Sequence, residues 1–218
     1  MAKPSRDALL AALLERHGRT YSDELGIDIE KGTPSPLFRW LCASLLFSAR
    51  ISAELAVRAA AALAERGWTT PQKMADASWK ERVETLNESG YARFDERTAT
   101  MLGDTCEILL DRYRGDLRRL RDEAEREPRR ERSLLKELKG IGDVGVDIFF
   151  REAQAAWQEL RPFADRRALD AAKRLDLGRD AEALAELVSE RDLPRLVTAL
   201  VRTELADDYD GVRDAAGR

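Results

Sequence analysis

Residues 138–145 read LKGIGDVG, and they are the most informative segment of the chain. A helical pattern with apolar residues at Leu134 and Leu135 leads into it, and an apolar run follows it. Gly140 and Gly142 can adopt positive φ, so the chain can reverse within a few residues with its amides pointing outward. Free amides at a helix N-terminus favour an anion such as a phosphate. The stretch therefore predicts a helix-hairpin-helix of the kind that grips a nucleic-acid backbone.

A carboxylate, Asp165, follows the hairpin after a turn that contains Pro162. The ordinary interpretation of Asp165 is an N-cap for a helix that begins at Arg166 and Arg167. A lone Gly-x-Gly between two helices is also more often a C-terminal turn than a phosphate site. Because the hairpin and the carboxylate occur together, we interpret them as one functional pattern and keep the capping role of Asp165 open.

The composition points to a globular, helical, non-membrane protein. Hydrophobic residues make up 44% and charged residues 36% of the 218 residues, which excludes a disordered chain and is enough for one or two compact domains. Ala, Leu, Arg and Glu dominate, and no run of alternating β-branched residues stands out, so we expect an all-α fold. Charge interrupts every long apolar stretch, and the N-terminus lacks a signal-peptide pattern. We therefore expect a cytoplasmic protein.

The cysteine and histidine counts exclude the common metal centres. Cys42 and Cys106 lie far apart inside helical patterns, where cysteine usually acts as a small buried hydrophobe. Together with the single histidine, His17, they cannot form a four-cysteine zinc site or an iron–sulfur cluster. We therefore predict no metal and no cofactor.

Capping residues and glycines divide the chain into expected helices. The pattern predicts a buried central helix at 37–49, a long helix at 94–113, and helices at 144–158, 165–175 and 193–206. Residues 20–33 are polar and are expected to form a loop. Residues 211–218 are expected to form a frayed tail.

Three segments resemble the helix-hairpin-helix (HhH-GPD) DNA glycosylase superfamily of endonuclease III-like proteins. The hairpin at 138–142 is similar to the family motif Leu-Pro-Gly-Val/Ile-Gly, with Lys139 in place of proline, and Asp165 falls where the family has an essential aspartate. Residues 45–50 look like its Leu-Leu-Ser-Ala-Gln segment, with Arg50 in place of glutamine. Residues 90–99 look like its Gly-x-Tyr segment. The similarity runs from about residue 36 to residue 177.

The resemblance implies a two-lobed helical glycosylase-like fold with the DNA cleft between the lobes. One lobe would be continuous, at 33–156, and would end in the helix-hairpin-helix. The second lobe, at 1–32 plus 157–218, would be built from both ends of the chain. The implied partner is double-stranded DNA, and we expect a monomer without a membrane or a metal cluster.

The resemblance also assigns roles to residues. Asp165 would be the catalytic carboxylate that stabilises positive charge on the sugar when a flipped base leaves. The residues expected to contact DNA are Lys139, Gly140, Ile141, Gly142, Arg50, Arg166 and Arg167. Val144 stands where the strand-cleaving branch of the family carries a nucleophilic lysine, which implies a monofunctional base-excision-repair glycosylase that hydrolyses the N-glycosidic bond.

A second interpretation remains open. The same scaffold can serve as a non-catalytic helix-hairpin-helix module that binds damaged or branched DNA, or a partner protein. Asp143, a carboxylate directly after the hairpin, and the acidic pI of 5.4 favour this alternative. Asp165 favours the enzyme. The base that would be recognised cannot be read from the sequence.

Overall fold

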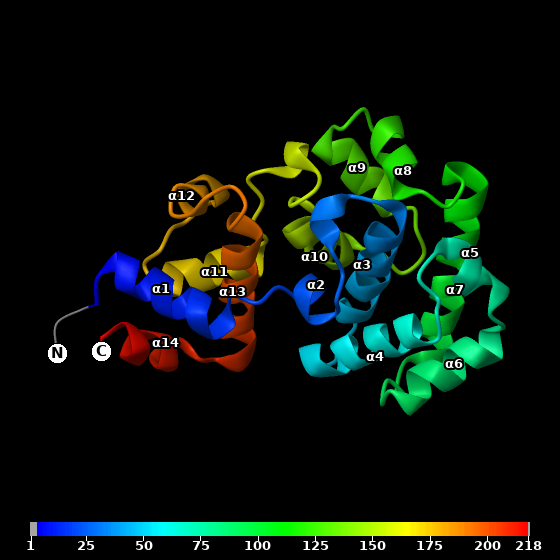
Figure 1. Ribbon diagram of the computed structural model, residues 1–218, viewed down its shortest axis with the longest axis horizontal. Coiled ribbons are helices and arrows are strands. Elements are labelled where there is room, and N and C mark those ends of the chain that lie inside the picture. The colour runs from blue at the N-terminus through cyan, green and yellow to red at the C-terminus, as the bar shows by residue number, and fades with distance from the viewer. Residues whose placement is uncertain (1–3, 218) are drawn as a thin grey trace.

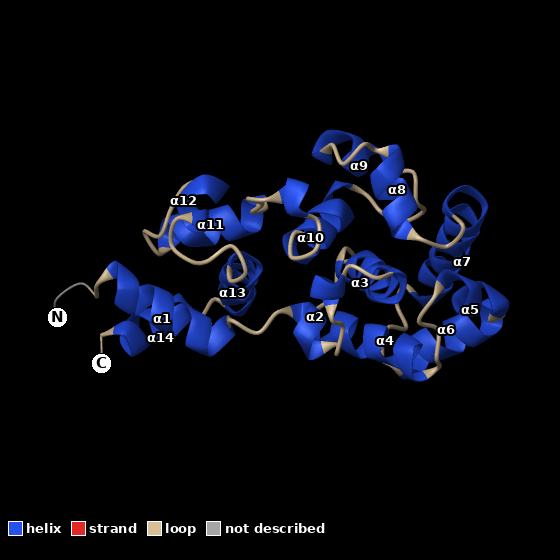
Figure 2. Ribbon diagram, turned by 45° about the horizontal axis from the view of Figure 1, so that its top comes forward, coloured by secondary structure: helices blue, strands red, loops and turns tan. Residues whose placement is uncertain are grey.

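The structure, a computed structural model, describes residues 4–217 as helices joined by short loops, with no β-strand in that range (Figures 1 and 2). The helices follow one another as α1 (Arg6–His17), α2 (Tyr21–Glu24), η1 (Ile29–Lys31), α3 (Pro34–Phe47), α4 (Ala53–Glu65), α5 (Pro71–Asp76), α6 (Trp79–Glu88), α7 (Asp95–Tyr113), α8 (Leu117–Glu123), α9 (Pro128–Leu135), α10 (Asp143–Ala153), η2 (Gln158–Leu160), α11 (Arg166–Arg174), α12 (Ala181–Ala185), α13 (Leu193–Ala206) and α14 (Tyr209–Ala216). The prediction of an all-α fold is confirmed. None of these helices is both long and apolar enough to cross a membrane.

Many helices begin where the sequence supplies a capping side chain. Side-chain oxygens accept hydrogen bonds from first-turn amides at Ser5, Thr20, Ser52, Thr70, Ser78, Asp116, Glu127, Asp165 and Asp180. Ser78 and Glu81 form a reciprocal capping box at the start of α6. Because the first amides of a helix have no partner within it, these oxygens fix where each helix starts.

The larger of two apolar cores is built around α3. This helix is buried along most of its length and packs against α4 and α10. The indole Nε1 of Trp40 donates a hydrogen bond to the carbonyl oxygen of Phe149 at 3.0 Å, which ties α3 to α10 inside the core. The ring of Phe149 in turn meets that of Trp157 edge-on, with the ring centroids 5.4 Å apart. The helix that follows the hairpin is thus fixed by the core.

The second core joins the two ends of the chain. Helices α1 and α11 pack on α13, α14 packs on α1, and buried residues such as Leu13, Ala168 and Leu200 fill the space between them. Figure 1 shows these helices, with α12, at one end of an elongated molecule, where both termini also lie, while α2 to α10 form the other end. Residues far apart in sequence therefore build a single helical unit.

Residues on both sides of the expected lobe boundaries, 32/33 and 156/157, lie in the larger core. Tyr21, Leu25 and Ile29 belong to the larger core, together with Trp157 and Leu160. We therefore propose that the lobes meet near residues 18–20 and 161–165. The first of these positions precedes residue 21 because the apolar face of residues 21–29 packs in the larger core.

Two predictions about irregular segments are wrong. The segment expected to be a loop at 20–33 contains α2 and η1, because Thr20 caps α2 and Ile29 is buried. The expected tail at 211–218 contains most of α14, which packs on α1 with Tyr209 and Val212 buried. Arg174 also stacks on the ring of Tyr209, 3.7 Å from its centroid. Tertiary packing stabilises a short helix that glycine and charge disfavour locally.

Candidate functional site

Of the two glycines in the hairpin between α9 and α10, only Gly140 adopts the positive φ that the sequence allows for both. Gly140 has φ +83°, and a Cβ at this position would lie 2.8 Å from the Sδ of Met101 and 3.1 Å from a methyl group of Leu45. Ile141 is buried in the larger core, and Thr105 donates a hydrogen bond to the carbonyl oxygen of Lys139 at 2.8 Å. Gly140 is therefore required by the fold, both for its dihedral angle and for space.

Gly142 differs from Gly140 because the fold does not require it. Its φ is −97°, which any residue can adopt, and a Cβ would meet nothing within 4 Å. Gly142 is the N-cap of α10, and no side chain caps this helix. A glycine in open space at an uncapped helix start leaves room for another molecule to approach the first amides closely.

Arg132 of α9 and Lys136, the residue directly after this helix, pair with the acidic residues that follow the hairpin. Lys136 binds the carboxylate of Asp143 at 2.8 Å, and Arg132 binds that of Asp147 at 2.6 Å. The hydrogen bond from Lys136 lowers the pKa of Asp143. The negative charge of Asp143 therefore faces a cation, and its repulsion of a phosphate at the hairpin is reduced.

Asp165 is held on both of its oxygens. Oδ1 accepts hydrogen bonds from the amides of Arg167 at 3.0 Å and Ala168 at 3.2 Å, which makes Asp165 the N-cap of α11. Oδ2 accepts a hydrogen bond from Nε of Arg151 at 2.7 Å. The side chains of Asp165 and Arg151 are only 5% and 7% exposed. The carboxylate is thus fixed in position by a neighbouring cation and two backbone dipoles.

Asp165 lines a pocket of about 530 Å³ to which residues of both cores contribute. The pocket is lined by Tyr21, Phe47, Val144, Asp147, Ile148, Arg151, Asp165, Arg166, Arg167, Asp170, Val201, Glu204 and Leu205. Phe47 ends α3, Val144 and Arg151 come from α10, and Leu205 comes from α13. The structure therefore brings Asp165, Arg166 and Arg167 together with Val144, the residue at the lysine position of the sequence comparison.

The other residues expected to contact DNA lie outside this pocket. Lys139 is exposed at the hairpin, and Arg50 is exposed in the turn between α3 and α4. Gly140, Ile141 and Gly142 form the hairpin itself. The expected DNA contacts are therefore distributed over the pocket, the hairpin and the α3–α4 turn.

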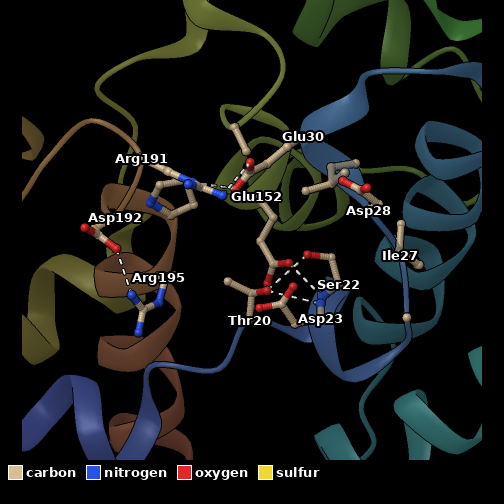
Figure 3. Close-up of a pocket in the computed structure, with 14 residues that line it drawn as sticks. Thr20, Ser22, Asp23, Ile27, Asp28, Glu30, Glu152, Arg191, Asp192 and Arg195 are labelled. Atoms are coloured by element: carbon tan, nitrogen blue, oxygen red, sulfur yellow. Dashed lines mark hydrogen bonds and ion pairs between the residues drawn. The ribbon is translucent and has the colours of Figure 1, made fainter.

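A larger hollow of about 740 Å³ lies beside α2, η1 and the start of α13, and it contains none of the predicted site residues (Figure 3). Its charged side chains largely pair with one another: Arg191 with Glu30 at 3.3 Å and Arg195 with Asp192 at 2.7 Å. Glu152 lines it from α10 and is fully occupied by protein donors. Volume alone therefore does not make this hollow the better candidate site.

Arg151, Tyr21 and Leu205 are among the pocket residues that were not predicted from the sequence. Arg151 follows Val144 by seven residues in one helix, so helical periodicity places both on the same face, and this signal could have identified it. Tyr21 lies in a segment expected to be a loop, and the guanidinium of Arg202 lies 3.8 Å from its ring centroid. Leu205 carries no sequence signal that separates it from core leucines.

The residues described bring no cluster of three or more His, Cys, Asp or Glu side chains together in an arrangement that could hold a metal ion. Cys42 and Cys106 are free and buried. Burial raises the pKa of Cys42 well above its usual range and that of Cys106 to about 12. Both thiols are therefore protonated and unreactive at neutral pH.

No protein-family model and no curated protein sequence matches the chain. Among solved structures, a non-covalent endonuclease III–DNA complex aligns with a TM-score of 0.50 and 20% identity over 78% of this chain and 72% of that one. A trapped covalent endonuclease III–DNA intermediate, an estranged-adenine complex, aligns with a TM-score of 0.48 and 19% identity over 75% of this chain and 71% of that one. With its core-bound hairpin, its two apolar cores and the first of these alignments, the chain has an all-α, endonuclease III-like fold.

Proposed function

We propose that the protein is a monofunctional DNA glycosylase of the base-excision-repair type, which hydrolyses the N-glycosidic bond of a base flipped out of duplex DNA. The observation that carries the proposal is the fixed carboxylate of Asp165 on the wall of a pocket between two helical units. The endonuclease III-like fold, and the DNA present in the similar solved structures, support the same class of activity.

The proposed chemistry uses Asp165 as an electrostatic and general-base group. As the bond between C1′ and the base nitrogen breaks, its electron pair leaves with the base and positive charge develops on the sugar. A carboxylate at the pocket wall stabilises that charge and can orient the water whose oxygen bonds to C1′. The water gives up one proton, and the departing base gains one. Arg151 and the α11 amides keep the carboxylate in place throughout.

The lack of a nucleophilic amine at Val144 supports hydrolysis by water. The sequence resembles a superfamily in which only the strand-cleaving branch carries a lysine at this position, and that lysine attacks the sugar. The nearby Lys136 binds Asp143 and does not line the pocket. We therefore expect base release without a covalent protein–DNA intermediate and without strand cleavage.

The proposed DNA contacts combine backbone amides with exposed cations. The uncapped start of α10 would receive one phosphate, next to the exposed side chain of Lys139. Arg166 and Arg167 are exposed at the start of α11 beside the pocket. Arg50 would contact the duplex from the α3–α4 turn. Because the net charge of the chain is −4, we expect binding to depend on these local contacts.

One observation favours a second candidate function, a non-catalytic module that binds damaged or branched DNA or a partner protein. The guanidinium of Arg151 contacts Oδ2 of Asp165, and a cation at this distance opposes part of the negative charge that would stabilise the sugar. In that alternative, the Arg151–Asp165 pair and the N-cap would be purely structural.

The experiment that separates the two functions uses duplexes that carry different modified or mismatched bases. Each duplex is incubated with excess protein, and one half of each sample is then treated with hot alkali, which breaks the strand at abasic sites. We expect alkali-dependent cleavage for at least one base and no cleavage without alkali. If no duplex becomes alkali-labile although some bind tightly, the non-catalytic function is correct. Cleavage without alkali, with an adduct trapped by borohydride, would contradict the monofunctional assignment.

A further inference from the structure

Two exposed apolar side chains lie at the same pocket as Asp165. Val144, from the first turn of α10, is 60% exposed, and Leu205, near the end of α13, is 48% exposed. Among residues 4–217, the other large hydrophobic residue that is exposed is Trp79 on α6. Its indole Nε1 donates a hydrogen bond to Thr100 at 3.0 Å. We call Val144 and Leu205 together the apolar rim.

The apolar rim is unusual because its two residues come from helices that belong to different cores, α10 and α13. Single exposed apolar residues are common and need no explanation. Two that line one pocket from separate helices place apolar surface on two of its sides, and such a pocket can hold the apolar part of a ligand. Each sits next to a carboxylate in sequence, Asp143 and Glu204, so charged side chains are tolerated at these helix ends.

The chemical groups around the apolar rim identify what it can bind. Arg166 and Arg167 line the same pocket with their side chains exposed, and they attract phosphate. Asp165 lies deeper, with its side chain almost fully buried. A ligand that fits this pocket has an anionic part for Arg166 and Arg167 and an apolar ring face for the apolar rim. It also has a reactive carbon that faces the carboxylate of Asp165. The deoxyribose of a nucleotide outside the helix stack has these properties.

We propose that the apolar rim binds the deoxyribose ring of an extrahelical nucleotide, with Leu205 of α13 as a sugar-contact residue. The choice of ligand rests on the proposed function, but the contact does not require catalysis. It adds a contact from α13, so both helical units would close on the same sugar.

The test uses a duplex with a single tetrahydrofuran residue, which is a deoxyribose ring without a base, and a fully paired duplex of the same sequence. Leu205→Ala and Val144→Ala should each weaken binding of the tetrahydrofuran duplex by about 3- to 10-fold, the effect of losing a half-buried aliphatic contact. Binding of the paired duplex should not change. Trp79→Ala, an exposed apolar residue away from the pocket, should leave both affinities unchanged.

Three results would overturn the proposal: equal weakening of both duplexes, no weakening of either, or no preference of the unmodified protein for the tetrahydrofuran duplex. The base-release assay distinguishes failure of this contact from failure of the glycosylase. If the two variants bind only the tetrahydrofuran duplex more weakly and the protein releases no base from any substrate, the proposed sugar contact is correct and the proposed glycosylase activity is wrong. If base release depends on Asp165 but Leu205→Ala binds the tetrahydrofuran duplex normally, the proposed glycosylase activity is correct and the proposed sugar contact is wrong.

Discussion

At the scale of single residues, the pair of Asp165 and Arg151 is the decisive feature. The family resemblance predicted Asp165, and its capping role follows from an aspartate directly before a helix. The ion pair could not be predicted because it depends on the angle between α10 and α11, which tertiary packing sets. As a result, a residue that the sequence presents as an ordinary helical arginine is buried against the candidate catalytic carboxylate.

The buried pair leads to a prediction about stability. Asp165→Asn keeps an oxygen for the α11 amides, but its NH₂ group faces Nε of Arg151, so a buried donor loses its acceptor. We expect unfolding free energy to fall by about 1–3 kcal/mol. The double variant Asp165→Asn/Arg151→Gln should recover part of that loss, because glutamine can present an oxygen to the asparagine. Urea unfolding of all three proteins tests this, and a double variant less stable than Asp165→Asn would contradict it.

At the scale of structural elements, the hairpin glycines have separable roles. Gly140→Ala should lower the unfolding free energy by about 1–3 kcal/mol, because alanine would be strained at φ +83° and would contact Met101. Gly142→Ser should change stability by less than about 0.5 kcal/mol, since serine is a good N-cap. It should nevertheless weaken duplex binding roughly tenfold, by blocking one charge-assisted hydrogen bond from an α10 amide.

Thermal unfolding and fluorescence anisotropy with labelled duplex measure these two effects independently. Duplex affinity of Gly142→Ser equal to that of the unmodified protein would show that the hairpin is only a structural turn. The sequence predicted the hairpin itself because its glycines act locally. It could not separate the two glycines, because the difference depends on Met101 and Leu45, which approach Gly140 from other helices.

Helix α9, which leads into the hairpin, carries a buried acid that makes stability depend on pH. Glu131 is fully buried, and no N–H or O–H group within residues 4–217 donates a hydrogen bond to its carboxylate oxygens. Its neighbour is the carboxylate of Glu159, which Arg121 binds on both oxygens at 2.5 Å. Burial and the Glu159 carboxylate raise the pKa of Glu131 to about 8. Two neighbouring buried carboxylates repel each other unless one of them is protonated, and Glu131 therefore holds a proton at neutral pH.

Because the pKa of Glu131 is higher in the folded chain than its ordinary 4.5, the unfolded chain loses this proton first as pH rises. The contribution of Glu131 to stability should therefore fall between about pH 4.5 and pH 8, by roughly 2–5 kcal/mol in total. Glu131→Gln keeps the size of the side chain and can donate to Glu159 at any pH. Urea unfolding at pH 5, 7 and 8.5 should show a smaller decline for Glu131→Gln, and identical declines would contradict the shared proton.

At the scale of the whole molecule, one carboxylate joins elements from both cores. Glu152 of α10 accepts hydrogen bonds from the amides of Tyr21 at 2.9 Å and Ser22 at 2.8 Å, and from the hydroxyl of Thr198 on α13 at 3.1 Å (Figure 3 shows the Ser22 side). Burial raises its pKa. No local pattern predicts such a residue, because its partners are more than forty residues away in the chain.

Glu152→Gln should destabilise the protein, because each carboxylate oxygen accepts a backbone N–H and glutamine offers only one oxygen. We expect a loss of about 1–3 kcal/mol in the free energy of unfolding. Glu190→Gln is the matched control, since the side chain of Glu190 is almost fully exposed, and it should change stability by less than about 0.5 kcal/mol. Equal stabilities of the two variants in urea unfolding would show that the Glu152 link contributes nothing measurable.

The central claim is that the Asp165 carboxylate catalyses base release, and single-turnover kinetics on a substrate from the duplex panel test it most directly. The matched control is Asp170→Asn, which removes one negative charge from the same pocket but neither caps α11 nor binds Arg151. We predict that Asp165→Asn lowers the rate of base release by about 10²–10³-fold, or 3–4 kcal/mol, while duplex affinity holds. Asp170→Asn should change the rate less than tenfold. Base release by Asp165→Asn at the rate of the unmodified protein would contradict the claim.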